Sequence, residues 1–173
     1  MAGSLIKITE TTVSSVASVT LGGSDWDNSY DVYMVRLNNV IPASDVQKLS
    51  VRFTVSGTAD SSANYDRAQK VLRTTAAFGN QTVVNASSVN SLDQGGTGTQ
   101  ESLQGIHYLY NFNNANEYSF ISYEGTARSS VAELNARQGG GVLTVAQACD
   151  GVQYYFASGN IASGTFALYG LKK

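Results

Sequence analysis

Apolar and polar residues alternate in short runs along most of this chain, and the alternation limits the folds open to it. The clearest run is 49–55, in which every second residue is apolar and the residues between are polar. Successive side chains of a β-strand point to opposite faces, so such a run predicts a strand with one buried face. The segments that we expect to be strands are 5–8, 13–21, 31–40, 49–55, 68–75, 106–112, 118–123, 131–137, 142–146, 152–156 and 165–171.

No segment has a convincing apolar period of 3.6 residues over three turns, so regular helices are not expected. Strong helix formers such as Lys, Glu and Leu are scarce, whereas the chain has 17 Gly and 10 Tyr residues. Short strands separated by turn-rich segments are typical of a β-sandwich or a barrel. A length of 173 residues predicts a single domain over 1–173. The polar stretch at about 79–100 is expected to be a flexible loop.

Charge and residue counts exclude several classes of protein. Charged residues make up 14% of the chain and the net charge is -2, which argues against nucleic-acid binding through bulk positive charge. The single Cys excludes an internal disulfide, and the single His excludes a multi-histidine metal centre. No window approaches the roughly 20 apolar residues of a membrane helix, so no membrane partner is expected.

The acidic segment 25–31 is the candidate metal site. Asp25 and Asp27 follow the spacing that begins a helix-loop-helix calcium loop. That motif needs Gly at its sixth position and Glu at its twelfth, where this chain has Tyr30 and Arg36. We therefore interpret the segment as a solvated acidic loop. A nonstandard calcium site formed by Asp25, Asp27 and Asp31 is the alternative.

Two glycine-rich segments have structural interpretations. Segment 95–98 lacks the Gly-Lys-Ser/Thr ending of a phosphate-binding loop, so a flexible loop tip is expected there. Segment 139–141 lies between two predicted strands, so it is expected to mark a hairpin or a bulge.

The remaining candidates for chemistry have no visible catalytic partner. His107 is expected to be a histidine of a sheet or an interface, and Cys149 a half-buried, inert thiol before a turn. Trp26 and Tyr30 are interpreted as core or interface anchors, with stacking on a sugar as the alternative. The scattered glutamates, which show no pairing suited to glycoside hydrolysis, are Glu10, Glu101, Glu117, Glu124 and Glu133. We therefore predict a non-enzymatic protein without a cofactor, and assign no catalytic, cofactor-binding or metal-binding residue.

The C-terminal segment 157–173 closes with the phrase Gly-Thr-Phe-Ala-Leu-Tyr-Gly-Leu at 164–171. Other characteristic stretches are 3–8, 16–21, 29–35, 37–40, 51–53, 56–60 and 64–66. Together these stretches resemble a family of virion structural proteins of tailed bacteriophages, especially marine ones. The resemblance covers nearly the whole chain, is weakest from 79 to 100, and includes no catalytic motif. It implies a jelly-roll-like antiparallel β-sandwich, with 164–171 as its final strand.

The pattern of this final strand predicts which side chains are buried. Phe166 and Leu168 lie on one face of the predicted strand, and Tyr169 lies on the other. We expect Phe166 and Leu168 in the core and Tyr169 near a sheet face or an interface. A terminal strand of this kind is able to lie inside a sheet and lock the sandwich.

The resemblance implies a role in the virion, and two roles stay open. The first is a capsid decoration (cement) protein on the head surface, a homotrimer that bridges subunits of the major capsid protein. The second is a receptor-binding tip module of a tail fibre or baseplate, which binds a host surface receptor or glycan. A fibre protein usually needs an N-terminal attachment segment, and the first predicted strand begins at residue 4 or 5. The expectation is therefore decoration.

Overall fold

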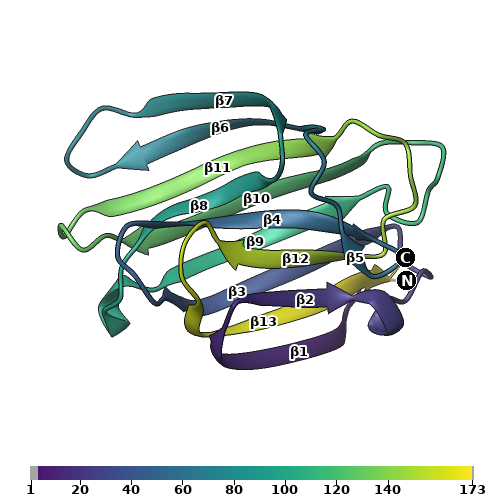
Figure 1. The fold of residues 1–173 in the computed structure, drawn as a ribbon, viewed down its shortest axis with the longest axis horizontal. Coiled ribbons are helices and arrows are strands. Elements are labelled where there is room, and N and C mark those ends of the chain that lie inside the picture. Colours follow the sequence, from purple (N-terminus) through teal and green to yellow (C-terminus); the bar gives the residue numbers. More distant parts are fainter. Residues whose placement is uncertain (1–3, 173) are drawn as a thin grey trace.

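The chain folds into a β-sandwich of two antiparallel sheets that face each other (Figure 1). The computed structural model describes residues 4–172, so residues 1–3 and 173 of the predicted domain lie outside the described part. Strands account for 65% of the chain and helix for 4%, which confirms the predicted all-β, jelly-roll-like sandwich. Within residues 4–172, no helix has the length and apolar character needed to cross a membrane.

The larger sheet has eight strands within the described residues. Their order in space is β1 (Ser4–Val16), β13 (Ile161–Lys172), β3 (Val32–Pro42), β9 (Leu103–Tyr110), β10 (Ser119–Arg128), β11 (Leu134–Leu143), β6 (Tyr65–Arg73) and β7 (Gly79–Ala86). The smaller sheet has the order β2 (Ser18–Gly22), β12 (Gly151–Phe156), β4 (Gln47–Val55) and β5 (Thr58–Ala59), and β8 (Val89–Gly95) also pairs with β4. The connections include the short 3₁₀ helices η1 (Gly23–Asp25) and η2 (Thr99–Glu101).

The C-terminal strand β13 lies inside the larger sheet, between β1 and β3. Phe166 and Leu168 are fully buried in the core, whereas Tyr169 on the other face is only partly buried. The predicted register of this strand is therefore confirmed. Because β13 pairs along both of its edges, backbone hydrogen bonds hold this strand to β1 and to β3.

β8, which pairs with β4 of the smaller sheet, packs over one side of the larger sheet. Figure 1 shows β8 in the region of β10 and β11, and β8 contacts both of these strands. β8 buries Val89 and Leu92, but it also buries the charged residue Asp93. The apolar core therefore gives way to a polar interior on this side of the sandwich.

The predicted flexible loop at 79–100 is wrong for most of its length. Residues 79–86 form β7, and residues 89–95 form β8. β7 is the last strand of its sheet and most of its side chains are exposed, so burial does not impose an alternating pattern there. In β8, register shifts against β4 interrupt the alternation, although Val89 and Leu92 are buried. Because both strands are rich in polar residues, the sequence pattern did not indicate them as strands.

The hairpin or bulge predicted at 139–141 is also wrong, because one continuous strand, β11, replaces the two predicted strands. Its register with β10 and with β6 runs through all three glycines without a shift. A Cβ on Gly139 would lie 2.5 Å from the Ala68 carbonyl oxygen, and one on Gly141 would lie 2.7 Å from Val89 Cγ2. These glycines therefore permit close packing by β6 and β8 rather than a turn.

Candidate functional site

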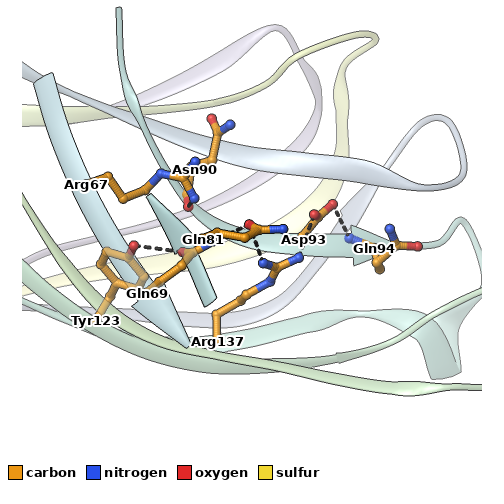
Figure 2. Close-up of polar contacts among 8 residues, drawn as sticks. All are labelled: Arg67, Gln69, Gln81, Asn90, Asp93, Gln94, Tyr123 and Arg137. Carbon is orange, nitrogen blue, oxygen red and sulfur yellow. Dashed lines mark hydrogen bonds and ion pairs between the residues drawn. The ribbon is translucent and has the colours of Figure 1, made fainter. Parts of the chain in front are cut away.

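A buried polar network joins β8 to the inner face of the larger sheet (Figure 2). Arg137 on β11 donates from Nη2 to Asp93 Oδ2 and from Nη1 to Gln81 Oε1, at 2.7 Å in each case. Gln69 on β6 donates to the same Gln81 oxygen at 2.8 Å and accepts a hydrogen bond from the Tyr123 hydroxyl at 2.8 Å. Side chains from five strands, β6, β7, β8, β10 and β11, thus meet in one hydrogen-bonded group.

Burial determines the protonation states in this network. Desolvation lowers the pKa of Arg137, and the neighbouring Asp93 carboxylate opposes that shift. Desolvation raises the pKa of Tyr123 to about 12. Arg137 and Tyr123 both keep their protons at neutral pH, so the network acts as a structural connection between strands. No sequence pattern indicated this network, because Asp93 is followed by Gln94 and Arg137 by Gln138, so neither charge is enclosed in an apolar run.

His107 lies in the core between the two sheets. Its ring Nδ1 is 2.8 Å from the hydroxyl of Tyr154 on β12, and its ring packs edge-on to Tyr123. Complete burial lowers the pKa of His107 to about 3, so the imidazole is neutral at physiological pH. The predicted position in a sheet is confirmed, and His107 acts as a polar link between the sheets.

Cys149 is more deeply buried than the half-buried thiol that was predicted. Its side chain is fully enclosed in the core, just before β12. Burial raises the pKa of the thiol to about 11, which keeps it protonated at neutral pH.

The acidic segment 25–31 forms a turn at one end of the sandwich. Asp27 accepts a hydrogen bond from the Ser29 backbone at 3.0 Å, and hydrogen bonds from the Ser29 side chain and backbone lower the pKa of Asp27. In the part of the chain that the structure describes, no three His, Cys, Asp or Glu side chains gather as a metal-binding group.

Trp26 and Tyr30 lie beside this turn. The Trp26 ring stacks on Tyr33 with centroids 3.9 Å apart, and its Nε1 donates to Asn113 Oδ1. The interpretation of Trp26 as a core anchor is therefore confirmed. The Tyr30 ring packs against Gly170, where an added Cβ would lie 2.3 Å from the ring. Tyr30 also lines a hollow at this end of the molecule.

The glutamates and the glycine-rich segment 95–98 have separate places in the fold. Glu10 lies 3.3 Å from Arg36 Nη2 on the face of the larger sheet, and Glu124 is exposed on β10.

Glu101 accepts a hydrogen bond from Gly98 N at 3.1 Å, and Asp45 accepts one from Thr97 N at 2.8 Å. The predicted loop tip is thus tied to its surroundings by two carboxylates. Glu117 precedes β10, and Glu133 precedes β11.

The outer face of the larger sheet contains a groove of about 630 Å³. Its floor is a row of small residues, since the register places Ser122, Gly140 and Ala68 side by side on β10, β11 and β6. Phe120 and Val84, which are 41% and 69% exposed, also line it. We call this hollow the outer-face groove. The exposed lining of this groove is therefore mainly apolar.

The loops at one end of the sandwich form two adjoining open hollows, which share Asn111 and Asn116. The first has a volume of about 680 Å³ and is lined by Asn28, Tyr30, Asp31, Asn111, Phe112, Asn113, Asn114, Ala115 and Asn116. The second has a volume of about 590 Å³ and is lined by Asn111, Asn116, Glu117, Tyr118, Phe120 and Ala146. We call them the loop-end hollows. Of their residues, Tyr30 was a predicted candidate for contact with a sugar and Asp31 for contact with a calcium ion, whereas loop 111–118 carried no sequence signal.

No protein-family model, curated protein or solved structure matches the chain. The observations that bear on function are therefore the outer-face groove, the loop-end hollows and the resemblance found in the sequence.

Proposed function

We propose that this protein is a capsid decoration protein of a tailed phage, which binds the head surface as a homotrimer and contacts the major capsid protein. The outer-face groove is the observation that carries the proposal. Its exposed Phe120 and Val84 are the side chains that a docked partner would cover. The closing phrase of the chain, which forms β13, supports the same assignment through its resemblance to phage virion proteins.

The role is mechanical and non-catalytic. Each copy removes apolar surface of the groove from water, which stabilises contact by about 25 cal/mol per Å² buried. Many copies on one head make the sum large through multivalency. The low net charge of -2 leaves little repulsion between neighbouring copies on a lattice.

The test adds purified protein to phage particles that lack it. Wild-type protein is expected to bind the heads and raise their resistance to heat, and light scattering is expected to give a mass well above 18.3 kDa. Val83→Asp and Val84→Asp place a charge in the outer-face groove without changing a residue of the loop-end hollows, and are expected to abolish binding. The matched control is Thr20→Asp, at an exposed position on β2 of the other sheet. Groove variants that fold and still bind heads like wild type would refute the proposal.

The second candidate is a receptor-binding tip module of a tail fibre or baseplate. The loop-end hollows favour it, because they combine aromatic side chains with several amides, which is the chemistry of a small-ligand site. Particles lacking the protein separate the two functions. Loss of head stability with normal adsorption supports decoration, whereas stable heads that no longer adsorb to host cells support the tip module.

A further inference from the structure

Unused amide groups distinguish the loop-end hollows from the turns around them. Both ends of the Asn113 amide are hydrogen-bonded within the protein: Oδ1 accepts from Trp26 Nε1, and Nδ2 donates to the Tyr33 hydroxyl. The side chains of Asn28 and Asn116, by contrast, make no hydrogen bond within the described part of the chain. A free amide presents a donor and an acceptor side by side. That arrangement matches a pair of neighbouring hydroxyl groups on a ligand.

Each hollow also contains an aromatic side chain. Tyr30 lines the first hollow, while Tyr118 and Phe120, which are 46% and 41% exposed, line the second. Asn111 and Asn116 lie between the two aromatic sites because both hollows share them. A sugar ring has an apolar face of C–H groups and a rim of hydroxyls, so it fits an aromatic surface beside an amide. Two such sites in succession fit more than one sugar residue.

The charged side chains that line the loop-end hollows disfavour the binding of anionic ligands. The charged side chains that line the two hollows are Asp31 and Glu117, and both are acidic. A sialic acid or uronic acid carboxylate placed here would meet like charges, which weakens binding. A neutral sugar meets no such repulsion.

We propose that the loop-end hollows bind a neutral oligosaccharide that spans both hollows across Asn111 and Asn116. The proposal deepens the receptor-binding candidate and rests on it, but it does not depend on docking through the outer-face groove. Volumes of about 680 and 590 Å³ lie within the usual range of small-molecule sites.

The test is an NMR titration of the full ¹⁵N-labelled chain with the neutral probes maltotriose, tri-N-acetylchitotriose and N-acetyllactosamine, and with 3′-sialyllactose as the anionic probe. At least one neutral probe is expected to give saturable shifts in residues 26–31 and 111–118. Asn116→Ala and Tyr118→Ala are each expected to weaken that binding by about tenfold, the loss typical of one good contact. The matched control is Asn80→Ala, at an exposed amide on β7 outside both hollows, and it is expected to bind like wild type.

Three outcomes would overturn the proposal: no saturable binding by any neutral probe, equal binding of sialyllactose, or unchanged binding by Asn116→Ala and Tyr118→Ala. Adsorption of particles that lack the protein reports separately on the receptor-binding role. Lost adsorption without sugar binding refutes the sugar site alone, whereas normal adsorption refutes the receptor-binding role itself.

Discussion

The guanidinium group of Arg137 lies 2.7 Å from the carboxylate of Asp93 inside the sandwich, with side-chain exposures of 1% and 10%. Arg137 belongs to the larger sheet, and Asp93 belongs to β8, which pairs with β4 of the smaller sheet. The ion pair therefore links β8 to β11 across the interior of the sandwich. A buried charge is tolerated when its partner and hydrogen bonds are present, and it is costly when they are removed.

Asp93→Ala is expected to lower the free energy of unfolding by about 3–5 kcal/mol, because it leaves the Arg137 charge buried without its partner. Urea denaturation followed by fluorescence measures the change. The double variant Asp93→Leu with Arg137→Met removes both charges and is expected to lose less than Asp93→Ala. A larger loss in the double variant would contradict this account.

His107 makes stability depend on pH. Its pKa is about 3 in the folded chain, against an ordinary value of 6.5, so the unfolded chain binds the proton more tightly. Above pH 6.5 this histidine is neutral in both states and does not lower the free energy of unfolding. As the pH falls from 6.5 towards 3, protonation of the unfolded chain lowers that free energy by up to about 1.4 kcal/mol per pH unit. The measurement is the free energy of unfolding at pH 4–7, for the wild type and for His107→Gln. The variant lacks the imidazole but keeps the same carboxylates, so it is the control for their titration. Parallel pH profiles for the two proteins would contradict the prediction.

Gly141→Ala is expected to destabilise the fold by about 1–3 kcal/mol, because the new methyl group collides with the buried Val89 side chain. Gly140→Ala is the matched control on the same strand, since its Cβ points to the outer-face groove and comes no closer than 3.2 Å to Ile121 O. Thermal unfolding of both variants measures the difference. Equal losses would show that β8 does not pack tightly against Gly141.

Leu168→Ala is expected to cost about 2–5 kcal/mol, because it opens a cavity in the core next to Phe166. Leu171→Ala, three residues later on β13, removes a side chain that is 44% exposed and is expected to change stability by less than about 1 kcal/mol. Chemical denaturation measures both. A small loss for Leu168→Ala would place this residue outside the core.

The alternation in the sequence predicted an all-β sandwich or barrel and the burial of the C-terminal strand, because period-two alternation is a local property of each strand. The resemblance to phage virion proteins implied the sandwich. The same rule failed at β7 and β8, where exposure and register shifts remove the alternation. It also failed at Gly139–Gly141, because a glycine that permits close packing has the same sequence signature as a glycine in a turn. Local patterns do not report which strand lies above a given glycine.

By itself, the sequence determined the all-β class and the inward face of strands such as β4 and β13. The tertiary structure alone decided that Arg137 meets Asp93, that Ser122, Gly140 and Ala68 form one floor, and that loop 111–118 adjoins segment 26–31. The physical reason is that alternation fixes which way a side chain points within its own strand. Which strands become neighbours depends on pairing between residues distant in sequence, and both candidate surfaces arise from such pairings.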